Sequence, residues 1–327
     1  MITRRLALGL PLAAYFANTA FADADAPPIA MVMNSGEATV SVIDMNSKQV
    51  INTLPTLREP SHWVLTPDRS EIYISDASGN ALFGFNPVTA APMGHMRIAD
   101  PYQLGYTPDN KYLLVNANRL NHVDVYDGAT LALVKRFDAG KTPSHLDFSP
   151  DSRWSFHSMQ ASDTLVSYDL TTLTERWTVP IGDTPAGVIW LNGKILVCIM
   201  GANGIIEVDP VTGAITRQQE TGEGAHNIFY AAETDTLYVS NRVGSTLSAL
   251  DPVTLQVRRN YSVPGGPDDI GIAPDGKIWI ALRFAESVAV MDPVTGNFDT
   301  IAVGRSPHGI FLSTYLQKKG KLTAQVL

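Results

Sequence analysis

The chain has 327 residues, of which 45% are hydrophobic and 17% are charged, as in an ordinary globular protein. Its formal net charge of -8 argues against nucleic acid as the main partner, because binding to phosphate needs a basic surface. After the N-terminal segment, no apolar run approaches the roughly 20 residues of a membrane-spanning helix, so no membrane span is predicted.

Residues 1–22 have the pattern of a signal peptide. Arg4 and Arg5 precede the apolar segment 6–16, and Ala20-Phe21-Ala22 is a cleavage signal of the A-x-A type. The sequence therefore predicts a protein that is exported to the periplasm or secreted. The arginine pair also resembles a twin-arginine export signal, so both this route and general secretion stay open.

One motif recurs through the rest of the chain: an alternating apolar strand, an Asp or Asn, a tight turn and another strand. The acidic or amide residue returns every 40 to 42 residues, at Asp44, Asn86, Asp127, Asp169, Asp209, Asp251 and Asp292. Asp or Asn followed by Pro is typical of a hairpin turn. Each unit carries four short strand patterns, as in 146–149, 154–157, 164–168 and 176–179. This period predicts an all-β, seven-bladed β-propeller over residues 23–315.

The two ends of the repeat predict how the ring closes. Residues 30–54 carry three strand patterns, one short of a blade, and residues 308–313 carry one. One C-terminal strand and three N-terminal strands complete the seventh blade and remove two exposed sheet edges. Residues 316–327 are predicted to form a tail outside the propeller.

Several units resemble the YVTN-repeat β-propellers, which are exported seven-bladed proteins. The resemblance is carried by Val40-Ser41-Val42-Ile43-Asp44, by Leu237-Tyr238-Val239-Ser240-Asn241 and by Ala273-Pro274-Asp275-Gly276. It extends over residues 29–315. Because that family is functionally mixed, the resemblance implies the fold and the export of this chain rather than an activity.

The start of the first strand in each unit is rich in histidine. The aligned position holds His62, Gln103, His145, Gly187, His226, Asp269 and His308. First strands line the central channel of a propeller, so these residues should form a ring at one mouth. Neutral imidazole is the commonest metal ligand, and the four histidines predict a site for Cu, Fe or Zn. Gln103 and Asp269 are candidate additional ligands or supports of the ligands. The alternative is that the histidines bond only to water and to backbone carbonyl groups.

Three other histidines lie outside this position. His95 belongs to an outer strand, and His122 lies in an alternating strand where an outward-facing polar residue is expected. His157 ends a second strand and is within reach of the same mouth. These assignments make His95 and His122 controls for the ring.

Positive charge is predicted on the same face. Arg242, Arg283 and Asn118 occupy equivalent places in the loops between second and third strands. Because arginine binds carboxylate and phosphate in a bidentate manner, these residues predict a small anionic substrate. The alternative is that the arginines pair with neighbours such as Asp268 or Glu286.

Three functions remain open from the sequence. The first is a monomeric, metal-dependent exported enzyme, either an oxidoreductase, a lyase or a hydrolase, in which the metal polarises oxygen or activates water. The second is a propeller that binds a ligand or a protein without catalysis. The third follows from a resemblance of residues 276–280 and 306–310 to virginiamycin B lyase, whose mechanism uses histidines on adjacent blades, glutamates and Mg. Here Asp269 stands beside His226, and Arg283 stands where that family has an acidic residue.

Overall fold

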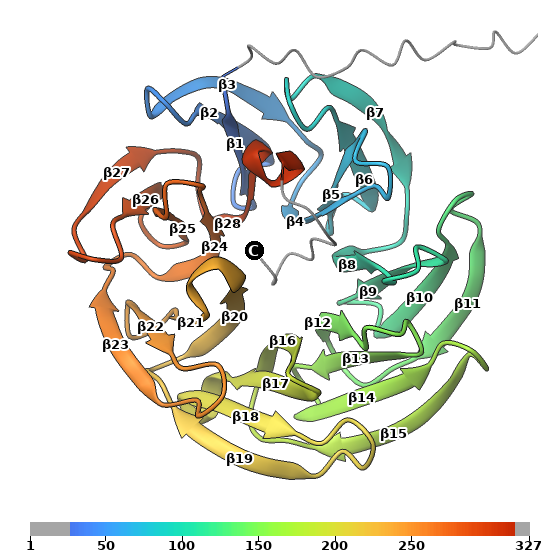
Figure 1. The fold of residues 1–327 in the computed structure, drawn as a ribbon. Helices are drawn as coiled ribbons and strands as arrows, with labels where there is room; N and C mark the ends of the chain where they lie inside the picture. The colour runs from blue at the N-terminus through green and yellow to red at the C-terminus, as the bar shows by residue number, and fades with distance from the viewer. Residues whose placement is uncertain (1–26, 318–327) are drawn as a thin grey trace, which may run out of the picture.

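The computed structural model describes residues 27–317, which form seven four-stranded antiparallel sheets arranged as blades in a ring (Figure 1). The predicted all-β propeller is confirmed. The predicted signal peptide, 1–22, and all of the predicted tail after residue 317 lie outside the described residues. Within 27–317, no helix has the length and apolar character needed to cross a membrane.

The blades follow one another along the chain, and each begins with its innermost strand. Blade 1 comprises β4 (Pro60–Leu65), β5 (Ile72–Asp76), β6 (Ala81–Phe85) and β7 (Pro92–Arg97). Blade 2 comprises β8 (Pro101–Tyr106), β9 (Tyr112–Ala117), β10 (His122–Asp127) and β11 (Leu133–Asp138). Blade 3 comprises β12 (Pro143–Phe148), β13 (Trp154–Met159), β14 (Thr164–Asp169) and β15 (Thr174–Pro180). Blade 4 comprises β16 (Pro185–Leu191), β17 (Lys194–Ile199), β18 (Gly204–Val208) and β19 (Ile215–Glu220).

The remaining blades complete the ring. Blade 5 comprises β20 (Ala225–Ala231), β21 (Thr236–Asn241), β22 (Thr246–Leu250) and β23 (Val257–Ser262). Blade 6 comprises β24 (Pro267–Ile272), β25 (Ile278–Leu282), β26 (Ser287–Met291) and β27 (Phe298–Ala302). Blade 7 comprises β28 (Pro307–Leu312), β1 (Ile29–Asn34), β2 (Thr39–Asp44) and β3 (Gln49–Pro55). Three short 3-10 turns are η1 (Met200–Ala202), η2 (Ala232–Thr234) and η3 (Ser313–Gln317).

Blade 7 joins the two ends of the chain as predicted. The register pairs Ala30 with Leu312 and Val32 with Ile310, so a C-terminal strand completes the N-terminal sheet. The backbone N–H of Ile29 also donates to Ser313 Oγ over 2.8 Å. Closure therefore satisfies the inner edge of β1, which would otherwise be exposed to another chain.

The turn after each third strand is held by its Asp or Asn. Asp209 is representative: its Oδ1 accepts hydrogen bonds from the N–H groups of Val211 and Thr212, both over 3.0 Å. The same pair of bonds recurs in all seven blades. The predicted turns are thus side-chain-capped turns of the Asx type.

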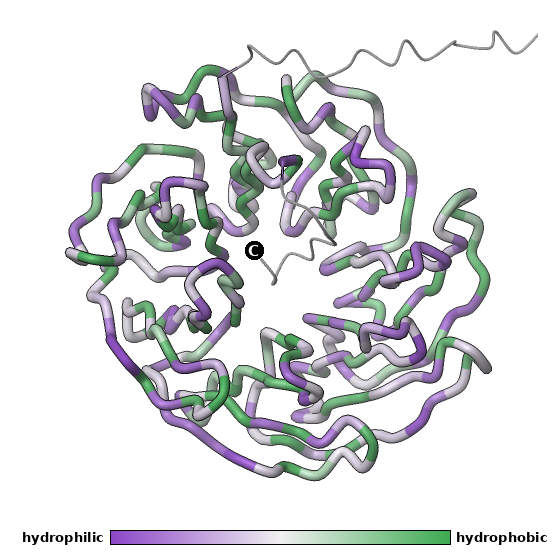
Figure 2. The backbone as a smooth tube through the Cα atoms, in the orientation of Figure 1, coloured by the Kyte–Doolittle hydropathy of each residue, from purple (hydrophilic) through white to green (hydrophobic). Residues whose placement is uncertain are grey.

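In each blade the three inner strands are largely buried, and the outermost strand is largely exposed. Innermost strands such as β4 are buried throughout, whereas outermost strands such as β23 are mostly exposed. Figure 2 shows the outermost strand β23 coloured largely hydrophilic. At the end of the inner strands, the η3 turn places Tyr315 in the core, where its hydroxyl oxygen accepts a hydrogen bond from the N–H of Ile272 over 3.0 Å.

The innermost strand of every blade begins with a β-bulge. In blade 1, Pro60 pairs with Asp76 and Trp63 pairs with Ile74, so two residues of β4 oppose one residue of β5. The equivalent shift occurs in the other six blades. A bulge bends the strand and redirects side chains, so two consecutive residues can both reach the mouth of the channel.

Candidate metal centre

The four histidines predicted from the repeat lie together at the mouth where the innermost strands begin. The centroid of the His62 ring is 4.6 Å from that of His308 and 5.3 Å from that of His145. His226 completes the cluster, with its ring centroid 5.4 Å from His145 and 6.3 Å from His308. All four side chains are buried.

The prediction that these histidines share one repeat-equivalent position is wrong. His62 and His145 are the second residues of their bulges, whereas His226 and His308 are the first residues of theirs. Because the bulge brings both of its residues to the mouth, the cluster forms although the equivalence fails. The first bulge position in the remaining blades holds Ser61, Tyr102, Ser144, Ala186 and Asp268.

Asp268 is the carboxylate at the centre of the cluster. Its Oδ1 lies 2.9 Å from His226 Nδ1, and its Oδ2 lies 3.7 Å from His308 Nε2. The sequence analysis considered Asp268 only as a partner for arginine. The signal that could have identified it is the proline before it, because Pro267-Asp268 begins its strand as Pro307-His308 does.

Asp268 also binds the two arginines. Arg242 Nη2 donates to Asp268 Oδ1 over 2.7 Å and contacts His226 Nε2 over 2.6 Å. Arg283 Nη1 donates to Asp268 Oδ2 over 3.3 Å. Of the two partners expected from the sequence, Asp268 is the one found, and Glu286 forms no ion pair with either arginine. The two arginine side chains remain partly exposed, at 15% and 24%.

The other predicted residues of the site lie further from its centre. Gln103 Oε1 accepts a hydrogen bond from the N–H of Leu146, which ties blade 2 to blade 3. Asp269 Oδ1 accepts a hydrogen bond from Asn227 Nδ2 over 2.7 Å. Asn118 follows β9 at the place equivalent to the arginines, but it does not contact Asp268 in the described structure. These three residues therefore do not join the group around Asp268.

Tyr102 was not singled out from the sequence. Its ring centroid lies 4.6 Å from His62 and 5.9 Å from His308. Burial raises the pKa of its phenol to about 12. The phenol therefore keeps its proton at neutral pH and adds a hydrogen-bond donor beside the imidazoles.

Burial decides the charge of the histidines. It lowers the pKa of His62 to about 3 and that of His226 to about 4, and it lowers the pKa of His145 and His308 well below the ordinary value. All four rings are therefore neutral at pH 7, which is the form that binds metals.

The two adjacent carboxyl groups are held in different states. Burial by itself would raise the pKa of Asp268, but the charge of Arg242 and the hydrogen bond from His226 hold it well below the usual range. Burial and the charge of Asp268 raise the pKa of Asp269. The site thus contains one firmly ionised carboxylate and one carboxyl group that favours its neutral form.

The residues present fit a metal ion. His226, Asp268 and His308 each offer one ligand atom, and these atoms lie within 4.8 Å of one another. In a tetrahedral zinc site, bonds of about 2.0–2.1 Å separate two ligand atoms by about 3.3 Å. The observed separations of 2.9 and 3.7 Å bracket that value.

Three histidines of the cluster also have a buried ring nitrogen without a hydrogen bond. These nitrogens are His62 Nε2, His145 Nε2 and His308 Nε2, whereas His226 Nδ1 faces Asp268 Oδ1 over 2.9 Å. Buried polar atoms are nearly always satisfied, so three such nitrogens in one place favour a ligand at this mouth.

The remaining histidines lie elsewhere. His157 bonds to Ser155 in its own blade and to Asn116 of blade 2, so it does not reach the mouth. His122 is buried with Nδ1 3.2 Å from Asp124, so the prediction of an outward-facing residue is wrong. His95 lies on the exposed outer strand β7, as predicted, and stacks on Phe83. Only His95 remains a clean control.

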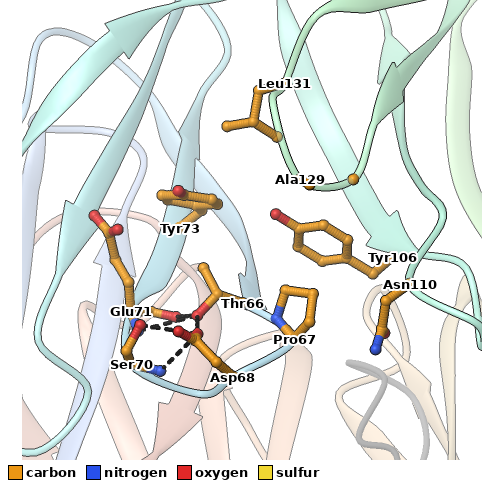
Figure 3. A pocket seen from close by; sticks show the side chains of 11 residues that line it. Thr66, Pro67, Asp68, Ser70, Glu71, Tyr73, Tyr106, Asn110, Ala129 and Leu131 are labelled. Atoms are coloured by element: carbon orange, nitrogen blue, oxygen red, sulfur yellow. Dashed lines mark hydrogen bonds between the residues drawn. The ribbon is translucent and has the colours of Figure 1, made fainter.

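A separate pocket of about 460 Å³ lies between blades 1 and 2, near the opposite ends of the inner strands. Figure 3 shows Tyr73 and Tyr106 on its two sides. The Asp68 carboxylate accepts hydrogen bonds from Thr66 and Ser70. The Asp68 carboxylate at this pocket is thus already hydrogen-bonded within its own turn.

Solved structures with the same fold have low sequence identity to the chain. A functionally unknown protein from Desulfotomaculum acetoxidans has a TM-score of 0.72 at 12% identity, covering 87% of this chain and 98% of that one. The periplasmic gluconolactonase PpgL of Pseudomonas aeruginosa has a TM-score of 0.70 at 18% identity, and the match covers 87% of this chain and 98% of that one. Dihydro-heme d1 dehydrogenase NirN in complex with DHE has a TM-score of 0.66 at 15% identity, and the match covers 88% of this chain and 76% of that one. At these identities the similarity shows the fold alone.

Sequence comparison gives one partial relative and one family. Antigen Lp49 of Leptospira interrogans is 25% identical over 135 residues, which are 37% of this chain and 30% of that protein, so the match spans less than a third of its length. A model of the YNCE-like β-propellers matches residues 6–317. The resemblance predicted from the repeats is thereby confirmed, and the chain belongs to the YNCE-like β-propeller family.

Proposed function

We propose that the mouth around Asp268 binds a transition metal through His226, Asp268 and His308, and that the protein hydrolyses a small anionic substrate there. The observation that carries this proposal is the set of buried, neutral imidazoles, three of them with an unsatisfied ring nitrogen, around one ionised carboxylate. Imidazole nitrogen with carboxylate oxygen suits Zn, Cu or Fe better than Ca or Mg.

The charges of the site favour an anion. Arg242 and Arg283 carry two positive charges against the single negative charge of Asp268, and a divalent metal adds two more. Both side chains are partly exposed, and each guanidinium group can donate to a carboxylate or phosphate group. An anionic substrate would therefore be drawn to the mouth and held beside the metal.

Hydrolysis is the reaction we favour because it needs only water besides the groups at the mouth. A bound metal lowers the pKa of a water ligand and polarises a substrate oxygen. The neutral rings of His62 and His145 can hydrogen-bond to the substrate or to water, the released proton passes to solvent water, and the arginines hold the anion. The gluconolactonase among the structural neighbours acts, by its name, on a small lactone, which is consistent with this substrate size.

A second candidate is an anion-binding propeller without a metal. One contact favours it: Arg242 Nη2 lies 2.6 Å from His226 Nε2 while it also binds Asp268, so the network is already linked. In this alternative, the ligand binds the arginines and no chemistry follows.

Elemental analysis of metal-loaded, exhaustively dialysed protein separates the two candidates. The metal site predicts about one equivalent of Zn, Cu or Fe in wild type, a marked loss in His226→Ala and His308→Ala, and no change in His95→Ala. Less than about a tenth of an equivalent in wild type would favour the metal-free candidate.

Arg242→Ala gives a second test with opposite signs. Because this guanidinium competes with a cation for Asp268 and His226, its removal should raise metal affinity. The same change should weaken binding of an anion such as phosphate by about 1.5–3 kcal/mol, as for a charged hydrogen bond. A variant that loses affinity for both would contradict the proposed division of roles.

The proposal includes export. Residues 1–22 carry the signal-peptide pattern, and one structural neighbour is named as periplasmic. Cell fractionation should find the protein outside the cytoplasm. Size-exclusion chromatography of the purified protein should show a monomer. Replacement of Arg4 and Arg5 by lysine should block export only if the twin-arginine route is used.

A further inference from the structure

The Ser61 hydroxyl lies between two histidines of the cluster. Ser61 Oγ is 2.9 Å from His62 Nδ1 and 2.9 Å from His308 Nδ1, so it links β4 to β28. All three side chains are buried. Among the described residues, Ser61 Oγ makes no other hydrogen bond.

The number of protons at this bridge is limited. A hydroxyl group has one proton to donate, and a neutral imidazole carries one N–H. If Ser61 donates to Nδ1 of one ring, that ring carries its proton on Nε2. The other ring must then donate its Nδ1–H to Ser61 Oγ, because two lone pairs cannot form a hydrogen bond, and its Nε2 has no proton.

Two equal tautomers are disfavoured. If both rings donated Nδ1–H to Ser61, the hydroxyl proton would point to no acceptor in a buried place, which is costly. If both rings presented a bare Nδ1, Ser61 could satisfy only one of them. The bridge is complete only when the two rings differ.

We infer that Ser61 holds His62 and His308 in opposite tautomers, with a bare Nε2 on His308 facing the metal and, on His62, an Nε2–H that has no partner among the described residues and can donate to a ligand at the mouth. A bare Nε2 beside the ionised Asp268 Oδ2 is favourable only with a cation between them, so the choice of His308 as the bare ring rests on the proposed metal site. His62 thus becomes a hydrogen-bond donor rather than the metal ligand expected from the sequence. Ser61 is a positioning residue, which acts through the two rings.

The chain contains a matched control for this bridge. Ser144 occupies in blade 3 the position that Ser61 occupies in blade 1, and its Oγ lies 2.9 Å from His145 Nδ1. Ser144 contacts no second imidazole among the described residues. Ser144→Ala removes the same hydroxyl from the same bulge without breaking a bridge.

Nitrogen-15 NMR of histidine-labelled full-length protein tests the inference, because protonated and bare ring nitrogens have well-separated shifts. Resonances are assigned with single His→Gln variants. We expect one Nδ1–H and one Nε2–H tautomer for His62 and His308 in the metal-free protein. With Zn²⁺ we expect Nδ1–H on His308 and Nε2–H on His62. Equal tautomers for the two rings, or Zn²⁺ on His62 Nε2, would overturn the inference.

Ser61→Ala and Ser61→Thr show whether the hydroxyl is responsible. Ser61→Ala should abolish the fixed pair of tautomers and lower Zn²⁺ affinity by about 10-fold or more, as for other residues that orient metal ligands. Ser61→Thr should restore both, and Ser144→Ala should leave the pair unchanged. If wild type binds no Zn²⁺, the proposed function fails, and the metal-free spectrum alone decides the tautomers. A pair that persists in Ser61→Ala would overturn the role of Ser61.

Discussion

Two positions recur in all seven blades, and their side chains behave differently. The turn after the third strand has Asp or Asn in every blade, and its side chain accepts hydrogen bonds from two backbone N–H groups each time. The bulge at the start of the innermost strand also recurs in every blade, but its side chains differ, from Ala186-Gly187 to Asp268-Asp269.

This difference separates the positions that hold the fold, which we call the frame, from those that form the candidate metal site. At the turn the side chain serves its own backbone, so any blade needs the same chemistry. At the bulge the backbone conformation repeats although its own side chains vary. In three blades a serine of the second strand, Ser75, Ser158 or Ser240, accepts a hydrogen bond from the N–H of the second bulge residue. The side chains of the bulge itself are therefore free to meet at the mouth. The candidate metal group lies on three consecutive blades, at His226, Asp268 and His308.

The largest expected effect comes from breaking the frame that both positions share. Removal of residues 307–327 deletes β28 and exposes the edge of β1, so we expect loss of the cooperative thermal transition. Calorimetry or circular dichroism checks this. Removal of 318–327 alone leaves every described strand and is the control. An unchanged melting curve after the longer deletion would show that ring closure is dispensable.

Next in size is the loss of the carboxylate at the centre of the bulge site. Asp268→Asn leaves two guanidinium groups and two imidazoles around a neutral amide, and we expect it to lower the free energy of unfolding by about 3–5 kcal/mol. Denaturant titration at pH 7.5 measures the change. A loss below about 1 kcal/mol would mean that the arginines are compensated by solvent.

Replacement of the neighbouring carboxyl group, Asp269, should change the stability in the opposite direction. Because the pKa of Asp269 is raised in the folded protein, its contribution to stability is present below about pH 4 and is lost as the pH rises through the folded pKa. Asp269→Asn should therefore stabilise the protein at pH 9 relative to wild type and have less effect at pH 4. Destabilisation that is equal at both pH values would contradict the raised pKa.

A smaller effect is expected from acid. The pKa of His226 falls from 6.5 to about 4 on burial, so its contribution to stability is present above pH 6.5 and is lost as the pH falls towards 4. Over that window one such histidine should account for about 3 kcal/mol. Unfolding of wild type and His226→Gln at pH 7.5 and 4.5 tests this, with exposed His95→Gln as control. Equal pH dependence in all three proteins would refute the assignment.

The smallest effect is expected at a single turn of the frame. Asp169→Ala removes the acceptor for the N–H groups of Thr171 and Thr172, so we expect a loss of about 1 kcal/mol. Metal and anion binding should not change, because the turn lies in blade 3, apart from Asp268. A change in metal content would show that frame and site are coupled.

The fold was predictable because its signals are local. The 40–42-residue period, the Asx turns and the incomplete first blade together define the ring and its closure. The clustering of four histidines was also visible in the spacing. The one-residue offset between His62 and His226 was not, because blade 5 begins with Gly224-Ala225 instead of the proline that marks the other inner strands.

The contacts between residues of different blades could not be predicted from the sequence. Asp268 stands out only when the bulge turns it towards His226 and His308 and when both arginines bind it. The bridge of Ser61 to His308 joins residues 247 positions apart. Such contacts depend on which blades are neighbours and on the direction in which each bulge turns its side chains. A local sequence pattern contains neither kind of information.

X-ray absorption at the metal edge tests the central claim most directly. Protein loaded with one equivalent of Zn²⁺ should show a first shell of nitrogen and oxygen at about 2.0–2.2 Å, with two imidazoles and one carboxylate as the protein ligands. Asp268→Asn should change that shell, and His95→Ala should not. A spectrum of hydrated Zn²⁺, or one of four imidazoles unaffected by Asp268→Asn, would contradict a centre built on His226, Asp268 and His308.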